Sequence, residues 1–372
     1  MEDKGIRFLF DSAVIWFYPF HHLGNKDIEG EQMSRVVVLG AGSSKDCGLP
    51  LGQEVFNDFE HNGGPAWYPF MNDVFFQFRS GYPTFEVVLS LIESWIKNGQ
   101  TIGHYNPSDL ENIRRSLIES FLEIFNRICP WIYLKLKADH DLMPEAVVMD
   151  ENLLWYRNFF NQVIHKDGNT TFISMNYDVL LDDVLFKMDK KDGINFTYGF
   201  DIYDVDNQDE RCRENGVLLL KPHGSINLVQ CPKCKRILTF KNWSPGIQTS
   251  SYACRSCGEG LNILILPPTF NKGVEDEPYA SIHKKVSEEI SKADEILIIG
   301  YSLPDYDLNI LQAFIEGMVK NKNGATFKVE IVDNINNEKE QSKIKDKYGS
   351  IFRCAVNKII CHFEGFKKYA AG

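Results

Sequence analysis

Short apolar runs recur along the chain, and turn-forming residues follow each of them. Most runs are apolar on both faces and each is too short to be a buried helix, which is typical of parallel strands covered by helices on both sides. Stretches with helical character lie between them and would serve as crossover connections. The pattern predicts a doubly wound α/β fold with a mainly parallel sheet. The predicted strands are 36–39, 171–175, 217–220, 263–266, 296–299 and 327–332, and the predicted helices are 178–188, 281–292 and 307–320.

Three segments fall outside this alternation. Residues 85–165 carry apolar side chains at helical spacing, which predicts a helical insertion. Residues 226–261 contain paired cysteines and are expected to form a separate ribbon. The aromatic segment 1–34 precedes the first strand and is interpreted as an arm for self-association, or as residues ahead of a native start at Met33. Its aromatic side chains could equally cover the chain's own sheet. The remaining segments, 35–84, 166–225 and 262–372, are assigned to the α/β domain.

Four cysteines form two Cys-x2-Cys pairs, Cys231 with Cys234 and Cys254 with Cys257. Two such knuckles allow four thiolates to converge in a tetrahedron, the arrangement that zinc prefers in structural sites. A site with four sulfur ligands leaves no position for water or substrate, so we expect the metal to shape the ribbon and take no part in catalysis. The alternative is four reduced cysteines without a metal.

Composition narrows the class of protein. The chain has 372 residues, 44% of them hydrophobic, which is enough for a large core. A net charge of -11 argues against broad binding to a nucleic acid backbone. The other cysteines show no disulfide framework, and we find neither a signal peptide nor an apolar run long enough to span a bilayer. We therefore expect a soluble cytoplasmic protein with no membrane partner.

Glycines and polar residues follow several of the predicted strands. The first strand runs into Gly40, Ala41, Gly42 and Ser43, where a glycine turn would let the backbone approach a pyrophosphate. Lys45 occupies the third glycine position of the hydride-transfer fingerprint, so dehydrogenase chemistry is disfavoured. Because carboxyl ends of parallel strands share one edge of a sheet, the polar residues after later strands should meet there. These are Asn176, Asp178, His223, Gly300, Ser302 and Asp333.

In order, these motifs resemble the sirtuin-like family, and specifically its bacterial branch of NAD+-consuming anti-phage effectors. The resemblance runs over roughly residues 35–340. The motifs are Gly-Ala-Gly-x-Ser at 40–44, Asn-Tyr-Asp at 176–178, Lys-x-His-Gly-Ser-Ile-Asn at 221–227, the cysteine pairs, and Gly-Tyr-Ser-Leu-Pro at 300–304.

The resemblance implies a Rossmann-like NAD-binding domain and a role for each motif. It places the pyrophosphate at Gly40, Ala41, Gly42 and Ser43, and the adenosine half near Gly300, Ser302 and Asp333. Catalysis at the nicotinamide ribose would fall to Asn176, Asp178 and His223, with His223 as general base. NAD+ would be the substrate, alongside one structural zinc ion. For chains of this size, the family also implies partnership with a HerA-type ATPase. We expect a homo-oligomer as well, because an unrestrained NAD+-consuming enzyme would poison its own cell.

Two departures bear on the reaction. Deacylating sirtuins follow Gly-x-Pro with Asp-Phe-Arg, whereas here Gly48-Leu49-Pro50 continues with Leu51-Gly52. In place of their peptide-pairing Phe-Gly-Glu, this chain has two prolines in residues 266–272, which remove backbone donors. We therefore expect an NAD+ glycohydrolase that releases nicotinamide and ADP-ribose and depletes NAD+ in anti-phage defence. The alternatives are an NAD-dependent deacylase or ADP-ribosyltransferase, and a non-catalytic NAD- or ADP-ribose-binding subunit.

Overall fold

A seven-stranded, all-parallel sheet forms the centre of the fold in the computed structural model, in the order β11-β10-β9-β1-β2-β5-β3. The structure describes residues 33–51, 67–75, 83–128, 151–167, 169–208, 216–240, 252–265, 278–324, 326–354 and 356–372. The strands of this sheet are β1 Arg35–Leu39, β2 Thr170–Ser174, β3 Phe196–Thr197, β5 Val217–Leu220, β9 Glu295–Ile299, β10 Lys328–Val332 and β11 Ile360–His362.

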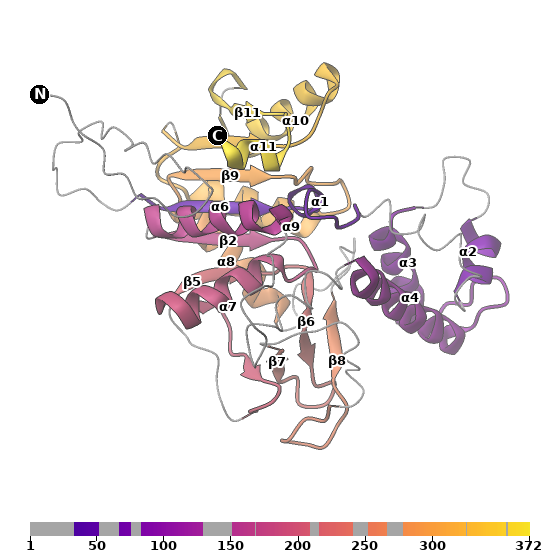
Figure 1. The fold of residues 1–372 in the computed structure, drawn as a ribbon. Coiled ribbons are helices and arrows are strands. Elements are labelled where there is room, and N and C mark those ends of the chain that lie inside the picture. Colours follow the sequence, from indigo (N-terminus) through magenta and orange to yellow (C-terminus); the bar gives the residue numbers. More distant parts are fainter. Residues whose placement is uncertain are drawn as a thin grey trace, which may run out of the picture. The chain divides into compact units, whose positions relative to one another are not determined.

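Both faces of this sheet are buried. The sequence predicted this, because most of its strand segments are apolar on both faces. Val37 and Leu39 of β1 belong to one hydrophobic cluster, and Val36 and Val38 belong to another, because successive side chains of a strand point to opposite faces. Helices cover both faces (Figure 1). The predicted doubly wound α/β fold is confirmed. The first cluster includes α6 Glu151–Asp167, α7 Leu180–Asp192 and α11 Phe366–Ala371, and the second includes α8 Tyr279–Lys292, α9 Leu308–Lys320 and α10 Glu338–Ile351.

Strand β1 marks the point where the chain reverses direction across the sheet. It pairs with β2 on one side and β9 on the other, and Leu39 lies in register with both Ser174 and Ile299. The segments that leave these three strands therefore emerge side by side at the carboxyl edge. In open α/β sheets this is where ligands bind.

The segment between β1 and β2 contains the helices α2 Tyr68–Phe75, α3 Phe85–Lys97 and α4 Pro107–Ile128. Their apolar faces pack together, with the rings of Phe85 and Phe121 stacked at 4.3 Å between centroids. Phe121 also meets Tyr177, which follows β2, edge to face at 5.3 Å. This contact brings the insertion helices to the carboxyl edge of the main sheet.

A second sheet of four strands has the order β4-β7-β6-β8. One strand assignment from the sequence is wrong here: 263–266 was predicted as part of the main sheet, yet β8 pairs antiparallel with β6. An apolar run of this length fits either sheet, and only the long-range pairing with β6 decides between them. The strands are β4 Tyr203–Asp204, β6 Gly224–Gln230, β7 Ile237–Thr239 and β8 Asn262–Ile265.

The aromatic arm, 1–34, lies almost wholly outside the described residues, so its proposed role in self-association stays a prediction. None of the helices in the described ranges combines the length and apolar character needed to cross a bilayer.

Candidate active site and metal centre

A cavity of about 470 Å³ lies at the carboxyl edge of the main sheet. Segments that follow β1, β2, β5, β9 and β10 all contribute to its walls, together with the start of α3 in the insertion. It is thus built at the reversal point of the strand order, where the topology predicts a ligand site. The lining includes the sequence-predicted residues Ala41, Gly42, Asn176, Asp178, His223, Gly300, Ser302 and Asp333.

The glycines after β1 and β9 allow two turns to pack against each other. A Cβ atom on Gly42 would lie 2.7 Å from the Cα of Gly300, and one on Gly300 would lie 2.3 Å from the amide nitrogen of Ser43. Gly300 also has a φ of 60°, a conformation that side chains other than glycine adopt with strain. The amide of Gly42 donates to the carbonyl of Gly300 at 3.0 Å. This close packing is a reason for the glycines that is independent of any phosphate.

Asn176 fixes the turn after β1. Its buried side-chain amide lies 3.0 Å from the carbonyl of Gly40, 3.1 Å from the Ser43 hydroxyl and 3.0 Å from the Ser44 hydroxyl, all of which can accept from it. Within the described part of the chain, its Oδ1 atom has no hydrogen-bond partner. Since Asn176 lines the cavity, this oxygen is available to accept a hydrogen bond from a ligand or a water molecule.

Both carboxylate oxygens of Asp178 accept hydrogen bonds from the protein. One carboxylate oxygen accepts from the Ser44 hydroxyl at 2.7 Å, and the other accepts from the amide of Leu180 at 3.0 Å, in the first turn of α7. Burial raises the pKa of Asp178, and the nearby Lys221 ammonium opposes that rise. Asp178 thus joins the β1 turn to the start of α7, besides lining the cavity.

Lys221, which follows β5, is buried together with its partner Asp182 of α7. The ammonium lies 2.9 Å from the Asp182 carboxylate and also donates to the main-chain carbonyl of Asp178. The other Asp182 oxygen accepts from the hydroxyl of Tyr198 at 2.6 Å. A buried charge with this many partners is stable only while all of them are present. The pair secures the backbone that carries Asp178 and His223.

His223 is enclosed, and both of its ring nitrogens have partners. Nδ1 lies 3.2 Å from the carbonyl of Met175, which can only accept, so Nδ1 carries a proton. Nε2 lies 2.9 Å from a carboxylate oxygen of Asp307. Burial lowers the pKa of His223, but the charge of Asp307 outweighs this effect and leaves the pKa above its usual 6.5. The geometry is that of an imidazolium paired with a carboxylate.

Asp307 and Glu86 are two acidic cavity residues that the sequence reasoning missed. Asp307 precedes α9 and accepts from the hydroxyl of Tyr301 as well as pairing with His223. Its position only three residues after the Gly-Tyr-Ser-Leu-Pro motif could have drawn attention to it. Glu86 lies in the first turn of α3, where an acidic residue is common for reasons of helix stability alone. Nothing in the sequence connects it with the strand ends.

Asp333 follows β10 at the adjacent part of the edge. One of its oxygens accepts from the amide of Asn334 at 2.8 Å, and burial raises the pKa of the carboxyl group. Ser302 is more exposed and, like Asp333, lines the cavity. The structure therefore brings the predicted adenosine-side residues and the predicted catalytic residues to one cavity. Gly40 and Ser43 are not among its lining residues but contact the Asn176 amide.

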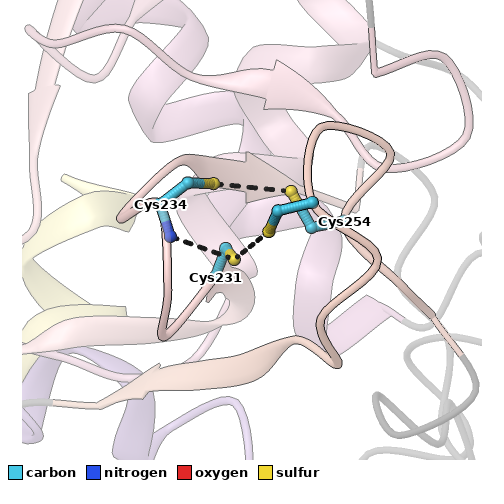
Figure 2. Close-up of side chains that lie close together, drawn as sticks. Cys231, Cys234 and Cys254 are labelled. Carbon is cyan, nitrogen blue, oxygen red and sulfur yellow. Dashed lines mark hydrogen bonds between the residues drawn. The ribbon is translucent and has the colours of Figure 1, made fainter.

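The four cysteines of the ribbon converge, and Figure 2 shows Cys231, Cys234 and Cys254 facing one another from two loops. Their sulfur atoms and that of Cys257 all lie within 4.8 Å of one another, with Cys231 and Cys257 at 3.3 Å and Cys234 and Cys254 at 3.5 Å. A tetrahedral zinc with Zn–S bonds of about 2.3 Å requires sulfur atoms roughly 3.8 Å apart. The cluster fits a structural zinc ion.

A protein-family model matches part of this chain. Residues 130–307 match the Sir2 family. The Sir2-like segment contains Asn176, His223, Asp307 and all four cysteines, and it agrees with the expectation of a sirtuin-like chain. Among curated proteins, none matches the chain.

Solved Sir2 structures resemble the chain at low identity. One is Sir2Tm bound to a propionylated peptide, with 12% identity, a TM-score of 0.42, and coverage of 91% of this chain and 90% of that one. Another is a Sir2 homologue mutant in complex with ADP-ribose, with 14% identity, a TM-score of 0.36, and coverage of 87% and 92%.

Proposed function

We propose that this chain is an NAD+ glycohydrolase of the Sir2 type, which cleaves the bond between nicotinamide and ribose to give nicotinamide and ADP-ribose. The observation that carries the proposal is the convergence of Asn176, His223 and Asp307 on one cavity at the carboxyl edge of a Rossmann-like sheet, within the Sir2-like segment. The cavity volume of about 470 Å³ lies in the range of small-molecule sites.

The polar groups around the cavity suit the parts of NAD+. The Asp333 carboxylate can accept hydrogen bonds from both hydroxyls of a ribose. The turn from Gly40 to Ser43 and the segment at Gly300 and Ser302 flank the space for the pyrophosphate. Asn176, whose amide contacts the same turn at the Gly40 carbonyl, and His223 surround the nicotinamide ribose in this proposal. Asp178 acts by holding the β1 turn through Ser44.

Cleavage of NAD+ requires little acid assistance because the nicotinamide ring departs as a neutral molecule and takes the electrons of the glycosidic bond. The ribose passes through an oxocarbenium-like state, as in glycoside hydrolysis. Water then bonds to the anomeric carbon and gives up one proton. In this mechanism Asn176 Oδ1 orients the water, and Nε2 of His223 accepts the proton.

His223 can act as a base only after Nε2 has lost its own proton and its bond to Asp307 has opened. Asp307 raises the pKa of His223, so the fraction of competent base grows as pH rises through that raised value. The same pairing orients the ring before substrate arrives. Asp307 is thus a positioning residue in the proposed reaction.

The experiment that tests the proposal is product analysis by chromatography of purified protein with NAD+ alone and with NAD+ plus an acylated lysine peptide. A hydrolase forms nicotinamide and ADP-ribose in equal amounts in both arms. Nicotinamide that appears only with peptide, together with an acylated ADP-ribose, identifies a deacylase instead. Binding of ADP-ribose without any nicotinamide release identifies a non-catalytic subunit.

We also propose that the activity serves anti-phage defence by depleting cellular NAD+, under control of assembly or of a HerA-type ATPase. Support comes from the sequence resemblance and from the chemistry, since unrestrained hydrolysis would exhaust the host's own NAD+. Infected cells that carry the wild-type chain should lose NAD+, whereas cells that carry His223→Ala should keep it. Equal NAD+ loss in both would refute this role.

A further inference from the structure

Glu86 is an acidic side chain in the cavity wall that neither the sequence motifs nor the proposed mechanism uses. It lies in the first turn of α3, so it comes from the insertion and not from a strand end. Its Oε2 atom is shielded from solvent and has no hydrogen-bond partner among the described residues. A buried carboxylate oxygen without a partner is costly to keep, which calls for a reason.

Two other carboxylates of the cavity, Asp178 and Asp307, differ from Glu86 in this respect. Both oxygens of Asp178 accept hydrogen bonds, from Ser44 and from Leu180. Both oxygens of Asp307 accept as well, from His223 and from Tyr301. Of these three acids, Glu86 is the one with a shielded oxygen that has no partner among the described residues.

The charges around Glu86 do not balance within the protein. The groups that act on its carboxylate are its own backbone amide, the side chain of Thr84, whose hydroxyl also lacks a hydrogen-bond partner among the described residues, and His223, Asp307, Tyr177 and Tyr306. The imidazolium of His223 is already paired with Asp307, and the two tyrosines carry no charge near neutral pH because their pKa values are raised. Ionised Glu86 therefore leaves this part of the cavity with an excess negative charge. Burial raises the pKa of Glu86 and outweighs the opposing effects of its backbone amide, Thr84 and His223.

We propose that Glu86 makes the cavity selective for a cationic pyridinium ring, so that the site binds the oxidised dinucleotide in preference to the reduced one. The inference rests on the proposed function, in which the nicotinamide end of NAD+ lies beside His223. NAD+ carries a positive charge on that ring and NADH does not, while the rest of the two molecules is the same. The carboxylate also favours the cationic character that develops on the ribose during cleavage.

The preference can be measured without turnover. Isothermal titration with a carbocyclic NAD+ analogue, which keeps the pyridinium charge and resists hydrolysis, and with NADH gives the ratio of the two dissociation constants. In wild type the cationic ligand should bind more tightly. Glu86→Gln should reduce this ratio on the order of tenfold, because a unit charge a few ångströms from the ring is removed. Glu86→Asp, which keeps the charge, should retain most of the ratio.

Glu93→Gln is the matched control, since Glu93 lies on the same helix but pairs with Arg114 at 3.2 Å and does not line the cavity. It should leave the ratio unchanged. Thermal unfolding of each variant checks that the fold is intact. An unchanged ratio in folded Glu86→Gln, or equal binding of both ligands in wild type, overturns the inference and leaves the proposed hydrolase standing. Failure of wild type to bind either dinucleotide overturns both.

Discussion

The four-cysteine cluster and the cavity at the strand ends satisfy their polar groups in opposite ways. The four thiolates come from two nearby knuckles of one small sheet and match a single metal ion, which would leave no ligand position open. The cavity collects side chains from strands and helices far apart in the sequence, and it leaves the shielded Oε2 atom of Glu86 without a partner in the described structure. Polar groups that all have partners stabilise the fold, whereas polar groups left without partners can bind a ligand.

The largest effect is expected at the closed site. Cys254→Ser removes a buried zinc ligand, so the zinc content should fall well below one ion per chain, and the free energy of unfolding should drop by about 3 kcal/mol or more, because structural zinc supplies on the order of 10 kcal/mol in small zinc domains. Elemental analysis and thermal unfolding measure the two quantities. Cys361→Ser, outside the cluster, is the control and should keep its zinc. Normal zinc content in Cys254→Ser would refute the metal assignment.

A similar loss is expected behind the cavity. Lys221→Met leaves the buried Asp182 carboxylate without its counter-ion and should lower the free energy of unfolding in urea by about 3–5 kcal/mol. Lys292→Met is the matched control, because Lys292 pairs with Glu289 at the surface and its loss should cost at most about 1 kcal/mol. Equal costs in the two variants would show that the buried pair does not support the cavity.

The next largest loss of stability is expected where the turns after β1 and β9 pack against each other. Gly300→Ala places a Cβ atom 2.3 Å from the Ser43 amide nitrogen and should cost about 3 kcal/mol through strain and displaced backbone. Gly258→Ala has a comparable positive φ of 75° but nothing within 4 Å of the new atom, so about 1 kcal/mol is expected. Urea unfolding of the pair separates close approach from backbone strain. If the two costs agree, turn packing is not the reason for Gly300.

The smallest effect concerns the pH profile. Asp307→Asn removes the charge that raises the pKa of His223, so the rise of the hydrolysis rate with pH should move to lower pH by roughly one unit. Because Asp307 raises the pKa of His223 in the folded state, the His223–Asp307 pair stabilises the fold at pH values below the unfolded histidine pKa near 6.5. This stabilisation is lost as pH rises through the folded-state pKa.

Glu330→Gln provides the comparison for the pH experiment, because it removes a carboxylate 3.0 Å from His362, a histidine that does not line the cavity. Rates measured across a pH series should show no shift for this variant. A profile that is also unchanged in Asp307→Asn would exclude His223 as the titrating base.

The two regions also differ in how far the sequence alone could predict them. The cysteine cluster follows from spacing within a short segment, and the parallel strands follow from runs such as 36–39 that are apolar on both faces. Residues directly after strands, such as Asn176 and His223, could be assigned to one edge because the topology brings the carboxyl ends of the strands together. Glu86 could not, since its place in the cavity depends on how α3 packs. The strand at 263–266 was misassigned for the same reason, because only its pairing with β6 reveals its sheet.

The central claim is that the cavity hydrolyses NAD+, and nicotinamide release by purified protein tests it most directly. Wild type, Asn176→Ala and His223→Ala are compared with NAD+ and no peptide, with Lys292→Met as a surface control. The account predicts release by wild type and by the control, and a loss of about a hundredfold to ten-thousandfold in His223→Ala with the zinc content unchanged. Release that persists in both cavity variants would contradict it.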